Sequence, residues 1–507
     1  MNVTFRIVAL AMLILGLFSL TSDQTVSAQS FNCTDMIEIP QIECEALVAF
    51  YNSTNGAGWT DRTNWLETNT PSNWYGVTVV NGHVTQLNIV FNNLTGSMPS
   101  ELGNLTGLAR LYIYNNQNLT GNIPPELGSL TGLQRLYLYN NHLTGSIPPE
   151  LGSLINLEYM FLNNNQLTGS IPTELGNMTS LEWINLYDNQ LTGNIPQELG
   201  NLTNLGILYL HNNQLDGILP PGLGNLINLG TLDLHNNQLT GNIPSELGDL
   251  VNLTYFDLGN NQLSGSIPPE LGNLTNLLSF ELGYNQLTGN IPAEIGNLTN
   301  LGTLLLYHNQ LTGEIPPELG NMSSLGDLSL SYNQLVGEIP SELGYLTGLY
   351  SLDLSGNQLT GSIPTELGNL SGLEHLGLAS NHLTGSIPPE LDNFFLRDLD
   401  LSYNHLSGSI PAELGSLGSL RLLRLNNNQL TGEVPANIVN LVNLFDPGTW
   451  VDGGDGLNLD YNALTVPAGY PVTGNPLHDF LSTKDPNWHL RQITIDTQYI
   501  YLPIVLR

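Results

Sequence analysis

The sequence predicts a curved α/β solenoid in which about sixteen stacked repeats place a parallel β-sheet on the concave side, with a cap at each end. Three observations predict this fold. The pattern L-x-L-x-x-N-x-L-x-G-x-I-P recurs sixteen times, most copies lie 24 residues apart, and so short a unit cannot bury its leucines without stacked neighbours. The asparagine of the pattern is found at Asn92, Asn116, Asn141, Asn165, Asn189, Asn213, Asn237, Asn261, Asn285, Asn309, Asn333, Asn357, Asn381, Asn404, Asn428 and Asn462.

The repeat at residues 232–248 shows why each element forms. Leu232 and Leu234 alternate with Asp233, which predicts a strand with its leucines facing inward and the aspartate facing outward. Asn237 then turns the chain, and its amide can bond backbone groups of neighbouring coils that would otherwise cost about 1–3 kcal/mol each. A proline followed by a glycine four residues later predicts a short helical turn at 245–248 on the return path.

Charge limits the classes of partner. The 507 residues include 10 basic and 44 acidic side chains, for a formal net charge of −34. Such a field repels the phosphates of nucleic acids and anionic membrane surfaces, and it favours cationic partners. We therefore expect no nucleic-acid ligand.

The N-terminal residues are typical of an exported protein. Residues 1–28 contain one charge, Arg6, an apolar run at 7–20 and a small-residue cleavage site ending at Ala28, which predicts a signal peptide. An uncleaved N-terminal anchor is the alternative, but the run is short for a membrane span. No later segment is long enough to cross a bilayer. In an exported chain, Cys33 and Cys44 are expected to form one disulfide.

The ends of a solenoid need caps, because an open coil exposes leucines and strand edges. We assign residues 29–84 to an N-terminal cap, 85–465 to the solenoid, 466–490 to a C-terminal cap and 491–507 to an apolar tail. Within the back end, 446–456 is an insertion and 478–488 is expected to form a capping helix and turn. The last nine residues, 499–507, could add a strand to the cap, attach the protein to the envelope or bind a partner.

The repeat resembles a known family. The run LTGNIPSELGDL at 239–250, repeated in nearly every coil, is similar to the plant-type leucine-rich repeat of extracellular receptors and polygalacturonase inhibitors, and the resemblance covers roughly residues 45 to 465. It implies extracellular recognition on a twisted solenoid, with a second short sheet around the Leu-Thr-Gly segment.

The two ends also bear on this resemblance. Trp59, Trp65 and Trp74 resemble the N-terminal cap of the family, but Val79 stands where the family usually has a cysteine, so the second disulfide of the cap is missing. Kinase and transmembrane segments are absent from the sequence, so receptor signalling is not carried over. The ending at 480–488 resembles that of secreted bacterial proteins and favours a bacterial source.

Outward strand positions of stacked repeats form columns, and in repeats two to six these columns hold many aromatic residues and two arginines. An apolar aromatic patch on a soluble protein usually marks an interaction surface, and Tyr, Trp and Arg are frequent binding hot spots. The alternative is that these side chains pack against one another without a ligand. The candidate residues for binding a protein or glycan are Arg110, Tyr112, Tyr114, Arg135, Tyr137, Tyr139, Tyr159, Phe161, Trp183, Tyr187 and Tyr209.

Three acidic residues continue the middle column, and we add Asp233, Asp257 and Glu281 to the candidate ligand-binding set. Like charges on adjacent strands destabilise a sheet, so a cationic partner, a bound cation or solvent should compensate them. His211 and His235 lie close enough along the repeats to form a metal site with Asp233. No spacing motif supports such a site, and we expect no metal.

The sequence contains no catalytic motif. The glutamate that recurs after the proline of each repeat suits the first turn of a helix, and a catalytic carboxylate needs one special environment. We therefore predict a non-enzymatic protein without a cofactor. It is expected to be secreted or displayed on the cell surface and to bind a protein or carbohydrate through its concave face. A structural or adhesive protein of the cell envelope and an inhibitor of a secreted enzyme are the alternatives. The oligomeric state is not predicted.

Overall fold

The computed structural model describes residues 31–492 apart from 394, 446–455, 467–471 and 473. The predicted signal peptide at 1–28, nearly all of the insertion at 446–456 and the tail from residue 493 onward, including 499–507, lie outside the described residues. Within the described part, no helix is long and apolar enough to cross a membrane.

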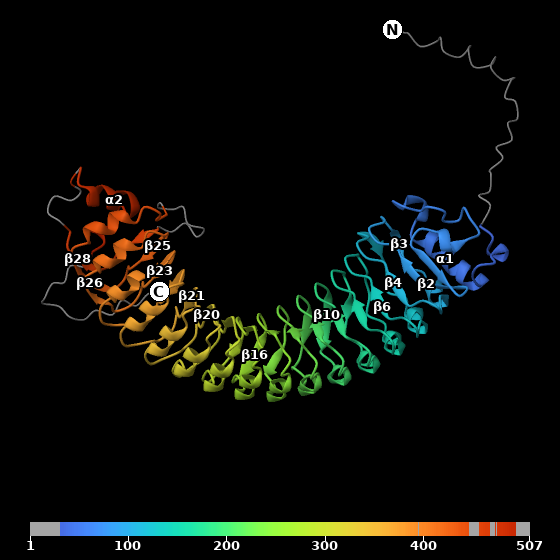
Figure 1. Ribbon diagram of the computed structural model, residues 1–507, viewed down its shortest axis with the longest axis horizontal. Helices are drawn as coiled ribbons and strands as arrows, with labels where there is room; N and C mark the ends of the chain where they lie inside the picture. Colours follow the sequence, from blue (N-terminus) through green and yellow to red (C-terminus); the bar gives the residue numbers. More distant parts are fainter. Residues whose placement is uncertain (1–30, 394, 446–455, 467–471, 473, 493–507) are drawn as a thin grey trace, which may run out of the picture.

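The chain forms one arc of stacked coils, with helix α1 (Gln41–Ser53) at one tip and helix α2 (Pro476–Lys484) at the other (Figure 1). A 17-stranded sheet runs along the inner side of the arc, and the short helical turns lie along the outer edge. The predicted solenoid with a concave sheet is confirmed.

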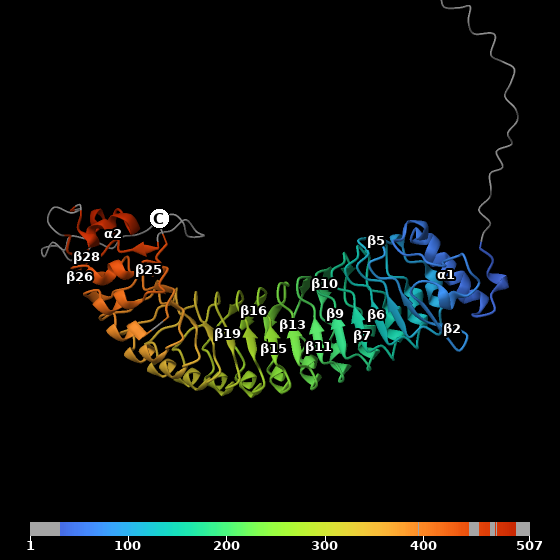
Figure 2. The ribbon, with the colours of Figure 1, turned by 45° about the horizontal axis from the view of Figure 1, so that its top comes forward.

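The inner sheet begins with strand β1 (Val77–Val80), which pairs antiparallel with β2, and continues by parallel pairing from one repeat to the next. Figure 2 shows these strands side by side on the inner face. They are β2 (His83–Asn88), β4 (Arg110–Tyr112), β6 (Arg135–Tyr137), β7 (Tyr159–Phe161), β9 (Trp183–Asn185), β11 (Ile207–Tyr209), β13 (Thr231–Asp233), β15 (Tyr255–Asp257), β17 (Ser279–Glu281), β19 (Thr303–Leu305), β20 (Asp327–Ser329), β21 (Ser351–Asp353), β22 (His375–Gly377), β23 (Asp398–Asp400), β25 (Leu422–Arg424) and β27 (Leu457–Asn458).

The repeated asparagine joins neighbouring coils, as the sequence predicts. Nδ2 of Asn237 donates to the carbonyl oxygens of Leu210, at 3.1 Å, and Leu234, at 3.0 Å. Its Oδ1 accepts a hydrogen bond from the backbone N–H of Leu215 at 3.0 Å. The same pattern recurs along the solenoid, for example at Asn261. Each side chain therefore satisfies buried backbone groups of its own coil and of the preceding one.

A second set of short strands follows the repeated asparagines. This second sheet, implied by the family resemblance, is present in separate short pieces of two or three strands. Gly241 has a φ of +74°, which glycine adopts without strain. The strands are β3 (Thr95–Ser97), β5 (Asn118–Thr120), β8 (Thr168–Gly169), β10 (Gln190–Asn194), β12 (Gln214–Asp216), β14 (Thr240–Asn242), β16 (Gln262–Gly265), β18 (Gln286–Leu287), β24 (Ser407–Gly408), β26 (Gln429–Gly432) and β28 (Ala463–Leu464).

The return path of each coil is a five-residue 3₁₀ turn, one residue longer than the predicted helical turn at 245–248. A β-carbon on Gly248 would lie 2.5 Å from the carbonyl oxygen of Glu270, so glycine permits the close stacking of adjacent turns. The turns are η4 (Ser100–Asn104), η5 (Pro125–Ser129), η6 (Pro149–Ser153), η7 (Thr173–Asn177), η8 (Gln197–Asn201), η9 (Pro221–Asn225), η10 (Ser245–Asp249), η11 (Pro269–Asn273), η12 (Ala293–Asn297), η13 (Pro317–Asn321), η14 (Ser341–Tyr345), η15 (Thr365–Asn369), η16 (Pro389–Asn393), η17 (Ala412–Ser416) and η18 (Ala436–Asn440).

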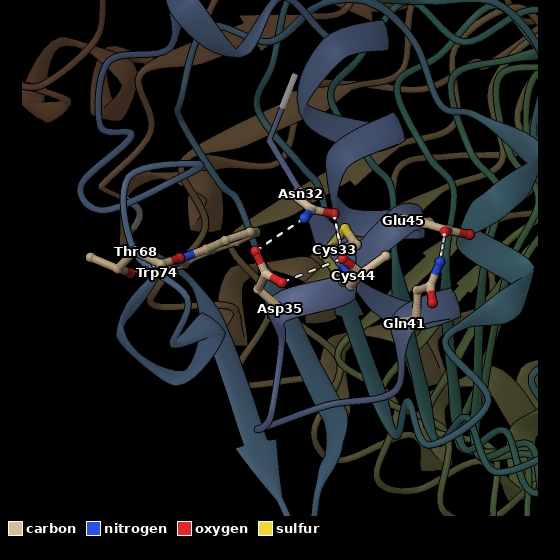
Figure 3. Close-up of a disulfide and its surroundings, with 9 residues drawn as sticks. Asn32, Cys33, Asp35, Gln41, Cys44, Glu45, Thr68 and Trp74 are labelled. Carbon is tan, nitrogen blue, oxygen red and sulfur yellow. Dashed lines mark hydrogen bonds between the residues drawn. A yellow bond between two sulfur atoms is a disulfide. The ribbon is translucent and has the colours of Figure 1, made fainter. Parts of the chain in front are cut away.

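At the front end, α1 and three tryptophans cover the first coil. Cys33 and Cys44 form the predicted disulfide, which joins turn η1 (Cys33–Asp35) to α1 (Figure 3). The rings of Trp59 and Trp65 lie 4.9 Å apart, and those of Trp65 and Trp74 lie 5.0 Å apart, all of them buried. Turns η2 (Gly56–Gly58) and η3 (Pro71–Asn73) complete this end.

At the back end, α2 and turn η19 (Trp488–Leu490) close the last coil. The predicted capping helix is present but begins at Pro476, because the side chain of Asn475 accepts hydrogen bonds from the first backbone N–H groups of the helix. Asp485 accepts a hydrogen bond from the backbone of Leu459 at 2.8 Å, and Trp488 is buried. Leucines that would be exposed at an open coil are thus covered.

Candidate ligand-binding surface

Parallel register places the candidate aromatic residues side by side on the inner sheet. Tyr112 on β4 is aligned with Tyr137 on β6, and Tyr137 with Phe161 on β7. The residue that precedes each of them is fully buried in the core, so the three rings face away from it. These core residues are Leu111, Leu136 and Met160.

The rings form a continuous file, which we call the aromatic ladder; its members are Tyr112, Tyr114, Tyr137, Tyr139, Phe161, Trp183, Tyr187 and Tyr209. Tyr137 stacks on Phe161 with centroids 4.5 Å apart, and Tyr114 stacks on Tyr139 at 4.3 Å. Trp183 meets Phe161 edge-on at 4.8 Å. Burial by these neighbours raises the pKa of Tyr139 to about 12.

Although these rings occupy the predicted outward positions, every member of the aromatic ladder is only partly exposed, because neighbouring rings pack against one another. Strands about 4.8 Å apart bring Tyr114 onto Tyr139 and Tyr137 onto Phe161 in stacked contact, so these rings turn their edges rather than their stacked faces to solvent. The alternative of mutual packing therefore describes part of what these residues do, and it leaves polar edges and hydroxyl groups available.

The two candidate arginines lie at one side of the ladder. Arg110 is exposed and is aligned with Arg135 on the next strand. The guanidinium of Arg135 lies 5.2 Å from the ring centroid of Tyr159, a cation–π contact, and a hydrogen bond with Tyr112 raises the pKa of Arg135. The hydroxyl of Tyr159 donates to Glu182 at 2.7 Å. This is a small cationic area on a strongly acidic chain.

An open hollow of about 700 Å³ adjoins the middle of the ladder, lined in part by Tyr159, Glu182, Trp183 and Ile207. Strand β9 beside it carries two polar atoms that are buried and lack a hydrogen-bond partner among the described residues. They are Nε1 of Trp183, a donor, and Oδ1 of Asn185, an acceptor. Such groups cost about 1–3 kcal/mol each, and unpaired groups of this kind in a folded protein require an explanation.

The surroundings of the acidic column, formed by Asp233, Asp257 and Glu281, differ from those that the sequence predicts. Asp233 and Asp257 are only 5% and 6% exposed, and Glu281 is half-buried, so solvent does not compensate the column. Histidines do. Nδ1 of His235 lies 2.6 Å from Oδ1 of Asp233 and 3.3 Å from Oδ2 of Asp257, and Nδ1 of His211 lies 3.0 Å from Oδ2 of Asp233.

The electrostatics of the column follow from burial and these contacts. Burial alone would favour the neutral forms of both His235 and Asp233. Hydrogen bonds with Asp233 and Asp257 outweigh it and raise the pKa of His235 to about 10. The close approach of His211 and the hydrogen bond with His235 likewise lower the pKa of Asp233 to about 2. Burial, followed by the charge of Asp257, raises the pKa of Glu281. Histidine contacts within the chain, rather than a separate cationic protein, therefore compensate the buried carboxylates of the column.

A second aromatic file escaped the sequence analysis. Tyr284, His308 and Tyr332 stack with centroids 4.4 Å apart at each step, and the two tyrosines are 48% and 56% exposed. All three have φ between 51° and 54°, at a position where many of the other repeats have asparagine, as at Asn236. The signal that could have found them is this departure from asparagine, since bulky residues are rare at positive φ.

Comparisons with known proteins agree with this architecture. A leucine-rich repeat region matches residues 83–238 and 148–261, and single leucine-rich repeats match eight segments between 252 and 441. These descriptions are of repeats, and no catalytic family is indicated. A comparison with curated proteins gives no match.

Among solved structures, the plant peptide hormone receptor RGFR1, in complex with RGF2, is 36% identical with a TM-score of 0.58; the match covers 75% of this chain and 66% of the receptor chain. The ectodomain of the Arabidopsis receptor kinase HAESA, in complex with an IDA peptide hormone ligand, is 31% identical with a TM-score of 0.52 and 84% of each chain covered. A leucine-rich-repeat protein of Leptospira interrogans is 38% identical with a TM-score of 0.56, and 71% of this chain and 88% of that chain are covered.

These matches, together with the sixteen asparagine-joined coils, identify the family. The chain belongs to the leucine-rich-repeat proteins.

Proposed function

We propose that the protein is a secreted or cell-surface binding protein, without catalytic activity, that recognises a segment of a protein or peptide on its concave face between β4 and β11. The observation that carries the proposal is the aromatic ladder on the concave sheet, which lies beside Arg110 and Arg135 and adjoins an open hollow. A bound peptide backbone offers carbonyl oxygens to the guanidinium and tyrosine hydroxyl groups at this surface.

The stacking geometry favours a peptide over a glycan. Sugars bind best to exposed ring faces, whereas neighbours at 4.5 and 4.8 Å flank Tyr137 on both sides and Tyr114 covers one face of Tyr139 at 4.3 Å. Ring edges, hydroxyl groups and guanidinium groups suit the carbonyl oxygens and side chains of an extended segment. The peptide hormone complexes formed by two similar plant ectodomains support the same class of ligand.

The test uses the full secreted chain as bait in a selection from a displayed peptide library, followed by titration of the selected peptide. Replacing Tyr112, Tyr137 and Trp183 together by alanine removes three central hot-spot rings and is expected to weaken binding at least about 100-fold. Replacing the exposed Tyr345 and Tyr350, which lie outside the ladder, should leave affinity unchanged. Wild-type affinity in a folded triple variant would exclude the ladder as the binding surface, and selection of glycans but not peptides from parallel arrays would favour the carbohydrate alternative.

We further propose that the protein is exported and that it comes from a bacterium. The signal peptide at 1–28 and the caps at 29–84 and 466–490 remain proposed boundaries, and N-terminal sequencing of the exported protein should give Gln29 as the first residue. The similar Leptospira interrogans protein supports a bacterial source. A structural or adhesive role remains the second candidate, and it predicts that retention on cells depends on 499–507.

A further inference from the structure

We propose that His211, Asp233 and His235, with Asp257 as a fourth ligand, bind one divalent transition-metal ion of the Zn²⁺ class on the concave sheet. Among the described residues, the first three form the group of histidine and carboxylate side chains whose ligand atoms all lie within 4.8 Å of one another. The inference stands apart from the proposed peptide site.

Topology brings these side chains together. β11, β13 and β15 pair in parallel, so that Tyr209, Asp233 and Asp257 occupy one column. His211 and His235 each follow that column by two residues, and therefore lie on the same face of the sheet. Their rings stack with centroids 4.6 Å apart and an interplanar angle of 10°.

The same nitrogen of both rings turns toward the carboxylates. Nδ1 of His211 is 3.0 Å from one oxygen of Asp233, and Nδ1 of His235 is 2.6 Å from the other and 3.3 Å from Oδ2 of Asp257. Ligand atoms around tetrahedral zinc are about 3.4 Å apart, given bond lengths of about 2.0–2.2 Å. The ligand atoms of His211, Asp233 and His235 already lie within 4.8 Å of one another, so small side-chain rotations bring them to this spacing. Asp257, which contacts His235 but lies outside that group, completes the set by a larger rotation.

Burial explains why an ion should be favoured here. Asp233 and Asp257 are both nearly inaccessible to solvent, and a divalent ion would compensate two buried carboxylates more completely than their histidine contacts do. Nδ1 of His211, although buried, makes no aligned hydrogen bond with the described residues. A metal ion would engage this nitrogen and both carboxylates at once. Imidazole with carboxylate ligands suits Zn²⁺, Cu²⁺ or Ni²⁺, whereas Mg²⁺ and Ca²⁺ prefer oxygen ligands alone.

A second histidine–aspartate contact in the chain serves as a comparison for the proposed metal site. His375 and Asp398 also approach to 2.6 Å, but these side chains are 46% and 22% exposed and form a pair outside any metal-binding group of described residues. We interpret this contact as an ordinary surface ion pair. It provides a control in which one histidine–aspartate contact is lost without affecting the proposed site.

The experiment is a calorimetric titration of the untagged, chelator-treated full chain with Zn²⁺ alone. We expect about one ion per chain, a decrease in affinity of about tenfold or more in His235→Gln and in His211→Gln, and wild-type affinity in His375→Gln. X-ray absorption at the zinc edge of the wild-type complex should show two imidazole ligands, which keeps the test valid if a variant misfolds. Absence of saturable Zn²⁺ binding, equal affinity in His235→Gln, or a spectrum with fewer than two imidazoles would overturn the proposal.

Discussion

At the scale of single residues, the repeated asparagine is the side chain that the fold can least replace. Asn237 is buried and serves four backbone groups in two coils, those of Leu210, Leu215, Leu234 and His235. An apolar residue at this position leaves those groups without partners and without access to water.

We therefore predict that Asn237→Ala lowers the free energy of unfolding by about 3 kcal/mol. Asn252 is the matched control, because its exposed side chain makes one hydrogen bond, to the carbonyl of Ile227 at 2.8 Å. Its replacement by alanine should cost less than about 1 kcal/mol. Urea unfolding of both variants measures the difference, and equal effects would contradict the role assigned to the repeated asparagine.

The second prediction at this scale concerns pH. Burial raises the pKa of Asp327 above its ordinary value of 3.8, so the folded state holds the proton more tightly than the unfolded state. Stability is therefore lost as pH rises from 3.8 through the raised pKa of the folded state, and the penalty is constant above it. Asp327→Asn should raise the Tm at pH 7 and give no difference at pH 3. A Tm difference that is the same at both pH values would show that the charge is not responsible.

At the scale of residues, the sequence predicts positions on the sheet but not the contacts between side chains. The positions of Asn237, Tyr137 and Asp233 on the sheet follow from the repeat period, because register is fixed by stacking. The contact of His211 and His235 with Asp233 does not, because it depends on side-chain rotamers and on how deeply the column is buried. The stacking of Tyr114 on Tyr139 could have been anticipated from strand spacing, and its effect on ring exposure was missed.

At the scale of elements, the inner strands are mostly three residues long, too short to be stable alone, and each gains from both neighbours. The outer turns are equally interdependent. The sequence predicts a turn after each proline, and the structure makes it a 3₁₀ helix because successive turns must stack at the spacing of the sheet. Gly248 illustrates this constraint, since its α-carbon faces the carbonyl of Glu270.

Gly248→Ala is predicted to destabilise the protein by about 1–3 kcal/mol, because the added β-carbon would lie 2.5 Å from a backbone oxygen that cannot move independently. Gly418 is the control: a β-carbon there would have nothing within 4 Å. Gly418→Ala should be neutral or stabilising by up to about 1 kcal/mol. Thermal unfolding of the two variants decides the matter, and a harmless Gly248→Ala would mean that the turns stack less tightly than described.

At the scale of the whole molecule, the arc gathers its unusual residues on the inner face. The aromatic ladder continues through Tyr187, whose ring stacks on His211 at 4.5 Å, into the histidine–aspartate cluster. One file of rings therefore links the proposed peptide site to the proposed metal site over successive strands. The fold could be predicted from the sequence because its period is regular; the site lies where side chains depart from that regularity.

The central claim is that a peptide or protein segment binds on the inner face between β4 and β11. Hydrogen–deuterium exchange of the full chain, with and without a peptide selected on it, tests this most directly. We predict slower exchange in the strands and following loops of the repeats from Arg110 to Tyr209, with the outer turns unchanged. Protection confined to the outer turns, or to the file of Tyr284, His308 and Tyr332, would contradict the account.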